Sequence, residues 1–237
     1  MPLANVILAG ALAISLGQIG AVTLSGFQAS NVAGVTRRAE GVRDVVFSTG
    51  GTLVITQGSE ESLIIDADSA VAQSITTRIS GTRLVIESSE SLRSSDAITY
   101  FLTVKDLFSI ELTGEGRVES DGFSTNRLRL ITRGAGDVRL DHLTVDGLRV
   151  ATYGVGSIDL SGTATQQDVE MYGAGIYRAD RLSSSDTTVE LRGSGRVSVQ
   201  SSNTLDARIW GSGTIEYSGN PRVSQGVSGS GRVTHRG

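Results

Sequence analysis

The chain has 237 residues, enough for one large domain or two small ones with a sizeable core. Its formal net charge of −4, without any Lys/Arg-rich run, argues against nucleic acid as a partner. It has no cysteine and only two histidines, far apart in sequence, so we expect no disulfide, metal site or cofactor. With 30 Gly, 2 Pro and 5% aromatic residues, the composition favours a β-rich repeat protein.

Residues 1–36 are predicted to be a signal peptide or a membrane anchor followed by a linker. The run "VILAGALAISL", from Val6 to Leu16, has the length of a signal-peptide core. No Lys or Arg precedes residue 37, and the apolar character continues to Leu24, which is long enough for an uncleaved anchor. A structural first strand or helix is the third alternative. The first two predict an exported protein.

Residues 37–106 contain short runs rich in Val, Ile and Thr, such as "VRDVVFST", "TLVITQ", "SLIIDAD" and "RLVIES". Turn signals separate the runs, among them Gly50-Gly51 and "SGT". The pattern predicts an antiparallel β unit.

Residues 107–237 follow a different rule, because a Gly-x-Gly pair returns about every 18–20 residues. Leu128, Leu130 and Thr132 share one parity with the glycines that follow them, which places aliphatic side chains and glycines on one inward face. A fixed period with such alternation predicts a parallel β-solenoid of about seven coils. The glycines expected to form two inward columns, where a Cβ has no room, are Gly114, Gly116, Gly134, Gly136, Gly154, Gly156, Gly173, Gly175, Gly193, Gly195, Gly211, Gly213, Gly229 and Gly231.

Two functional interpretations of the glycine pair fail on the sequence itself. A dinucleotide-binding loop needs a third glycine and a following helix, whereas another strand follows here. A calcium-binding repeat needs the motif GGxGxD at a nine-residue period, whereas the period here is 18–20 residues and the residue after the second glycine varies among Arg, Asp, Ser, Ile and Thr. The glycines are therefore predicted to be structural.

One outward column carries the candidate binding residues. The residue before each first glycine includes three aromatic side chains and two arginines, namely Arg133, Tyr153, Tyr172, Arg192 and Trp210. Aromatic rings can stack on sugars, and guanidinium groups can hydrogen-bond hydroxyls or carboxylates. The alternative is that these residues only stabilise the sheet as cross-strand pairs, or that a subunit covers them.

No catalytic residue is assigned. Glu170 and Glu190 fall on adjacent coils of a second outward column, and paired carboxylates are what glycoside hydrolysis uses, but no flanking residue identifies an acid and a nucleophile. His142 lies in "RLDHLT" without a nucleophile motif and is interpreted as a turn residue.

The order of these motifs resembles the family of auto-transporter adhesins with a head GIN domain. The likeness covers residues 37–237, from "FSTGGTLVITQGSEESLIIDAD" through "LTVKDLFSIELTGEGRV" to "VSGSGRVTHRG". It implies a right-handed parallel β-helix in an envelope-associated or secreted protein, and it supplies no catalytic or ligand residues. The fourth coil departs from the G-x-G-x-V pattern, because Tyr177 stands where an aliphatic residue is usual.

These features together predict an exported all-β protein of the periplasm, the outer membrane surface or the extracellular space. The first functional hypothesis is a non-enzymatic, adhesin-like module that binds glycan or another envelope component through the aromatic and arginine column. The alternatives are a polysaccharide-acting enzyme on a β-helix and a purely structural scaffold that forms homo-oligomers.

Overall fold

The computed structural model describes residues 34–89, 92 and 98–236. The segment predicted as a signal peptide or anchor with its linker lies outside the described residues, except for residues 34–36, of which 35 and 36 begin the first strand. All the described residues belong to one compact unit. The fold class is confirmed as all-β with a β-solenoid.

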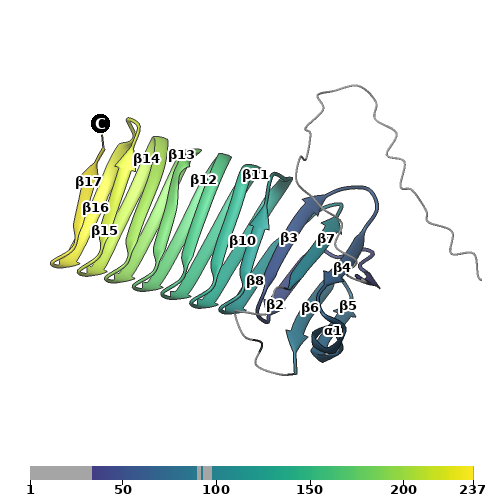
Figure 1. The fold of residues 1–237 in the computed structure, drawn as a ribbon. Coiled ribbons are helices and arrows are strands. Elements are labelled where there is room, and N and C mark those ends of the chain that lie inside the picture. The colour runs from purple at the N-terminus through teal and green to yellow at the C-terminus, as the bar shows by residue number, and fades with distance from the viewer. Residues whose placement is uncertain (1–33, 90–91, 93–97, 237) are drawn as a thin grey trace, which may run out of the picture. The chain divides into compact units, whose positions relative to one another are not determined.

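Among the described residues, seventeen strands form a single sheet system, and there is one short helix (Figure 1). The N-terminal elements are β1 (Val35–Arg38), β2 (Asp44–Ser48), β3 (Thr52–Gln57), β4 (Ser62–Asp66), α1 (Ser69–Ser74), β5 (Ile75–Ser80), β6 (Arg83–Ser88) and β7 (Thr99–Val104). The repeat strands are β8 (Ser109–Gly114), β9 (Arg117–Ser120), β10 (Ser124–Gly134), β11 (Asp137–Gly154), β12 (Ser157–Gly173), β13 (Ile176–Gly193), β14 (Arg196–Gly211), β15 (Thr214–Ser218), β16 (Arg222–Gly229) and β17 (Arg232–His235).

The repeat strands stack in parallel, each coil on the one before it. The first glycine of each pair lies opposite the first glycine of the next coil in every ladder from β8 to β16. The solenoid has about six turns. The sequence count of about seven coils was approximate.

Strand pairing in the N-terminal part is mixed, which differs from the antiparallel unit expected for residues 37–106. The pairs β1–β4, β4–β7 and β5–β6 are antiparallel. In contrast, β2 lies parallel between β6 and β8, and β3 lies parallel between β7 and β9. The turn at Gly50-Gly51 is thus a solenoid corner, since the carbonyl oxygen of Gly51 accepts a hydrogen bond from the amide of Arg117 at 2.9 Å.

The two positions of each corner require glycine for different physical reasons. The first glycine is not inward as expected: its backbone is exposed or half-exposed and turns the chain with φ between +97° and +143°. The second is mostly buried, and a Cβ at Gly136 would lie 2.6 Å from the carbonyl oxygen of Gly116 and 2.8 Å from the Leu112 side chain. From Gly134 onward the first glycine therefore needs both a left-handed conformation and a close approach to the backbone of the preceding coil, whereas the second needs only the close approach.

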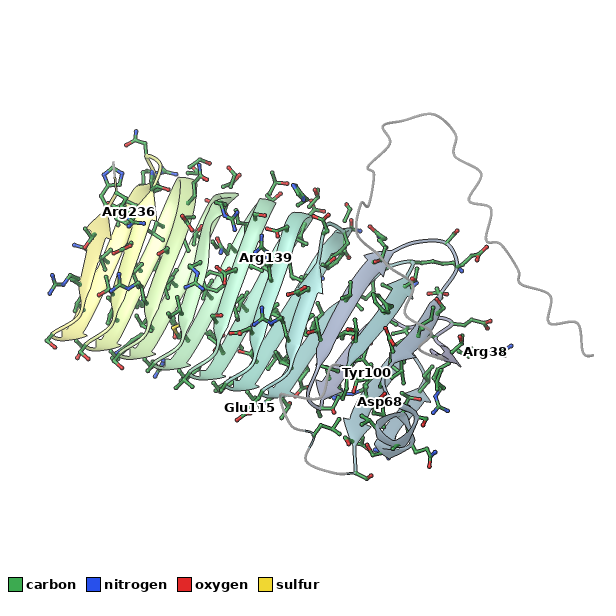
Figure 2. All side chains as sticks on the ribbon, viewed as in Figure 1. Arg38, Asp68, Tyr100, Glu115, Arg139 and Arg236 are labelled. Atoms are coloured by element: carbon green, nitrogen blue, oxygen red, sulfur yellow. The ribbon has the colours of Figure 1, made fainter. Side chains whose placement is uncertain are left out.

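The interior follows the predicted alternation of parity. Aliphatic side chains of the repeat strands, such as Leu130, Val150 and Leu191, are fully buried, while the arginines between them point to solvent. Figure 2 shows side chains along both faces of the strands.

The coil that departs from the repeat contains a buried polar trio. Tyr177 is completely buried, and its phenol oxygen accepts a hydrogen bond from Gln167 Nε2 at 2.6 Å. The hydroxyl of Ser184 donates to Gln167 Oε1 at 2.9 Å. Burial raises the pKa of the Tyr177 phenol, which stays protonated. The tyrosine at an otherwise aliphatic position is thus matched by Gln167 on the neighbouring strand β12 and by Ser184 further along its own strand β13.

Candidate functional site

The predicted binding column forms a continuous row on the outer face of the solenoid. Strand register places Arg133 opposite Tyr153, and each later member opposite the next. We call this row the Arg–aromatic ladder, and its members in order are Arg133, Tyr153, Tyr172, Arg192 and Trp210. Equal spacing from the glycine corner produces this alignment, because parallel coils that stack in register bring equivalent positions together.

The members of the ladder stack on one another. The rings of Tyr153 and Tyr172 are 5.0 Å apart between centroids and only 9° from parallel. Arg133 lies 5.5 Å from the Tyr153 ring, and Arg192 lies 5.6 Å from the Tyr172 ring and 4.4 Å from the Trp210 ring. Because each tyrosine ring has a neighbour on both faces, the ladder presents ring edges, phenol oxygens and guanidinium N–H groups to solvent.

We expect the stacking to stabilise the fold in a measurable way. A double-mutant cycle of Tyr153→Ala and Tyr172→Ala should give a coupling free energy of about 0.5–1.5 kcal/mol from denaturant unfolding. The pair Tyr153→Ala and Trp210→Ala, three coils apart, is the control and should be additive within about 0.5 kcal/mol. Equal coupling in both pairs would contradict direct ring stacking.

Trp210 ends the ladder and has one ring face without a stacking partner. Its indole is 38% exposed. Arg192 covers one face, while the opposite position on the next coil is Ser228, whose small side chain covers little of a ring. Among the described residues no other ring or guanidinium stacks on this indole. A flat apolar surface is therefore open beside Ser228.

The second outward column supplies counter-ions to the ladder. Glu111 forms an ion pair with Arg133, and Glu190 forms one with Arg192 at 3.3 Å. Glu170 binds Arg149 at 2.7 Å. Glu170 and Glu190 are register neighbours, as the sequence predicted, but each carboxylate is held by an arginine. Their contacts are those of surface ion pairs and give no acid and nucleophile arrangement.

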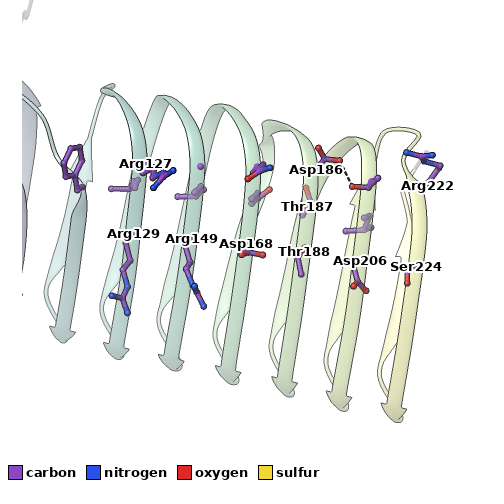
Figure 3. Close-up of a pocket in the computed structure, with 18 residues that line it drawn as sticks. Arg127, Arg129, Arg149, Asp168, Asp186, Thr187, Thr188, Asp206, Arg222 and Ser224 are labelled. Carbon is purple, nitrogen blue, oxygen red and sulfur yellow. Dashed lines mark hydrogen bonds between the residues drawn. The ribbon is translucent and has the colours of Figure 1, made fainter.

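A groove that the sequence analysis missed runs along the same outer face (Figure 3). It has a volume of about 680 Å³ and crosses strands β10 to β16. Two further outward columns line it. The first contains Arg129, Arg149, Asp168, Thr188, Asp206 and Ser224, and the second contains Arg127, Gly147, Gln166, Asp186, Thr204 and Arg222. The same counting from each glycine corner would have aligned these residues, but their mixed chemistry gave no signal without the concave surface.

The remaining sequence candidate, His142, lies at a corner of the coil. It has φ of +49° at a break in the register between Leu140 and Leu143. Its Nδ1 is 3.2 Å from a carboxylate oxygen of Asp121, and both side chains are largely exposed. In residues 34–89, 92 and 98–236, no three His, Asp or Glu side chains gather as they would around a metal ion. In the same ranges no helix has the length and apolar character of a membrane span.

Comparison with known proteins identifies the family. The family model described as "Putative auto-transporter adhesin, head GIN domain" matches residues 43–221. The chain belongs to this family of head GIN domain adhesins. The match includes every member of the Arg–aromatic ladder and almost the whole groove, and it confirms the resemblance found in the sequence.

Solved structures share the fold of this head GIN domain chain. A "putative adhesin" from Bacteroides fragilis is 24% identical, with a TM-score of 0.81, and the alignment covers 89% of this chain and 100% of that one. A "putative lipid binding protein" from Parabacteroides distasonis is 21% identical, with a TM-score of 0.68 and coverage of 87% and 98%. A "putative adhesin" from Parabacteroides merdae is 17% identical, with a TM-score of 0.66 and coverage of 87% and 96%. Comparison with curated proteins gives no match. At these identities the likeness shows the fold alone.

Proposed function

We propose that this head GIN domain chain is an exported, non-enzymatic adhesin-type module that binds glycan at its Arg–aromatic ladder. The family description supports an adhesin at the cell envelope or surface. The uncovered face of Trp210 beside Ser228 carries the glycan part of the proposal, because an exposed indole face is a stacking platform for the apolar face of a sugar ring.

The rest of the ladder supplies polar contacts in a row. The phenol groups of Tyr153 and Tyr172 form no hydrogen bond with other described residues. Coils repeat about every 4.8 Å, so hydroxyl and guanidinium donors recur along the row at that spacing. A linear glycan lying along the ladder would meet one donor group per coil, with its terminal or bent portion on Trp210.

The proposal predicts a fluorescence response, because Trp210 is the only tryptophan of the chain. Titration of the full chain with a panel of neutral and acidic polysaccharides should shift or quench its emission saturably for at least one of them. Ser228→Leu should weaken that binding about tenfold, since the leucine would cover the open indole face. Ser228→Ala leaves the face open and should bind as the native chain does.

Two results would contradict the glycan proposal. One is an emission that no polysaccharide changes. The other is a Ser228→Leu variant that responds as the native chain does. If the emission is already blue-shifted and becomes red-shifted on dilution, the indole is buried between copies of the chain, which favours the oligomeric scaffold instead.

A further inference from the structure

The groove on the outer face contains arginines whose charge is not balanced within the protein. After residue 107, only four arginines lack a carboxylate oxygen within 4 Å among the described residues. They are Arg127, Arg129, Arg222 and Arg232, and the first three line the groove. The other arginines of the repeats pair with neighbouring carboxylates, so the groove is distinguished from the rest of the solenoid surface.

Three arginine side chains, those of Arg127, Arg129 and Arg149, line one end of the groove. Arg127 and Arg129 are two residues apart on β10 and point to the same face, about 6.6 Å apart along the strand. Arg149 lies opposite Arg129 on the next coil, and Figure 3 shows the two side chains side by side. Only Arg149 has a counter-ion, Glu170. The cluster is therefore a site of positive potential that an anionic group would relieve.

Free space lies beside these arginines. Residue 147 is a glycine, and a Cβ built there would meet nothing closer than Arg127 Cγ at 3.8 Å. At the same end, Phe108 is 38% exposed and carries the guanidinium of Arg43 over its ring at 5.2 Å. Planar guanidinium groups bind carboxylate or sulfate through paired N–H donors. The free space beside Gly147 and the guanidinium donors together fit a carboxylate or a sulfate group.

The middle of the groove contains carboxylates instead of unpaired arginines. Asp168 has no ion pair or hydrogen bond among the described residues, and Asp206, two coils further on, forms an ion pair with Arg208 at 2.7 Å. The hydroxyls of Thr188 and Ser224 continue the row. Carboxylates accept hydrogen bonds from sugar hydroxyls and repel a polymer that carries a charge on every unit. The groove thus favours an uncharged, hydroxyl-rich portion next to an anionic one.

The far end restores a positive charge. Arg222 on β16 is five coil steps from Arg127, which corresponds to about 24 Å at the usual strand spacing. A ligand that reaches both ends must be extended, with anionic groups that are widely spaced along it.

We propose that this groove is an anion-recognition site for a linear acidic polysaccharide with sparse carboxylate groups, one of which binds Arg127 and Arg129. The inference rests on the proposed glycan function and names the class of glycan. Neutral hydroxyl-bearing sugar units lie over Asp168 and Thr188, and a further carboxylate reaches Arg222.

The charge requirement is tested by calorimetric titration of the full chain. Hyaluronan oligosaccharides, which carry a carboxylate on alternate sugars, should bind more tightly than polygalacturonate, which carries one on every sugar, and neutral dextran should not bind in the groove. The double variant Arg127→Gln/Arg129→Gln should bind hyaluronan at least about tenfold more weakly, with a smaller dependence on salt. Arg232→Gln, which removes an equally unpaired arginine outside the groove, is the matched control and should bind normally.

The space requirement has its own pair of variants. Gly147→Leu fills the groove beside Arg127 and should also weaken hyaluronan binding about tenfold. Gly226→Leu adds the same side chain to the outer face outside the groove, at a position where a Cβ meets nothing within 4 Å, and should have no effect. Both variants should have the same unfolding midpoint in denaturant as the native chain, which would show that Gly147→Leu fills the groove without damaging the fold.

Several outcomes would overturn the anion site. They are native binding in the arginine double variant, equal weakening by Arg232→Gln, unchanged binding in Gly147→Leu, and single-stranded DNA bound as tightly as hyaluronan. The proposed function fails separately, because its readout is the Trp210 emission with neutral and acidic polysaccharides and its dependence on Ser228→Leu. A retained Trp210 response with no preference for acidic glycans would refute the groove inference alone.

Discussion

Gly154→Ala is expected to lower the free energy of unfolding by about 3 kcal/mol or more. Gly154 has φ of +143°, and a Cβ on it would lie 2.0 Å from the carbonyl oxygen of Gly134 on the preceding coil. That oxygen already accepts a hydrogen bond from the amide of Val155 at 3.0 Å. An alanine must therefore separate two coils or break the corner hydrogen bond, and neither change relaxes locally in a close-packed stack.

The matched control lies on the same strand. Gly147→Ala adds the same methyl group where the backbone is not left-handed and the nearest atom is 3.8 Å away. We expect the free energy of unfolding of this variant to be unchanged or to rise by up to about 1 kcal/mol, because alanine restricts the unfolded chain more than glycine does. Guanidinium chloride unfolding of both variants measures the difference. Similar unfolding midpoints for the two variants would show that the corner at Gly154 has room for a Cβ.

Gln167→Leu is expected to destabilise the fold by about 2–5 kcal/mol, although leucine matches the aliphatic side chains at the same position of other coils. Leu128, Leu148 and Leu205 occupy that inward row. Loss of the amide would leave the buried hydroxyls of Tyr177 and Ser184 without their present partner. A buried polar group without a partner loses its hydration and gains nothing in return.

The triple variant Gln167→Leu/Tyr177→Phe/Ser184→Ala separates the effect of lost hydrogen bonds from the effect of altered packing. It removes every polar atom of the trio together, so it should be more stable than Gln167→Leu alone by at least about 1 kcal/mol. Denaturant unfolding of the single and triple variants gives this coupling. A triple variant that is less stable than the single one would mean that packing, and not hydrogen bonding, is what the coil requires.

The row of candidate residues could be predicted because a parallel stack with a constant repeat has only one register that keeps the glycine corners together. Tyr153 and Tyr172 are therefore neighbours as a direct consequence of their distance from Gly154 and Gly173. Which surface of the rings faces solvent did not follow from the sequence, since it depends on side-chain rotamers. In the structure the rings cover one another, and only Trp210 keeps an open face.

The pairing of β2 and β3 could not be predicted in the same way. Gly50-Gly51 between two β-rich runs is equally suited to a hairpin turn and to a solenoid corner. Only the stacking of Gly116 on this corner distinguishes a solenoid corner from a hairpin turn. The two segments are so close that a Cβ at Gly116 would lie 2.5 Å from the carbonyl oxygen of Thr49 and 2.6 Å from the Phe47 ring. That contact joins residues about seventy apart, which no local pattern reveals.

By itself, the sequence determined the all-β class, the repeat, the inward position of the aliphatic residues in the repeat strands, and hence the row formed by Arg133, Tyr153, Tyr172, Arg192 and Trp210. These properties follow from a period of two along a strand and a constant number of residues per coil. The tertiary structure alone decided the groove, its unpaired Arg127 and Arg129, and the buried partners of Tyr177. Those features depend on the curvature of the sheet and on contacts between side chains of different strands, which the order of residues along the chain does not specify.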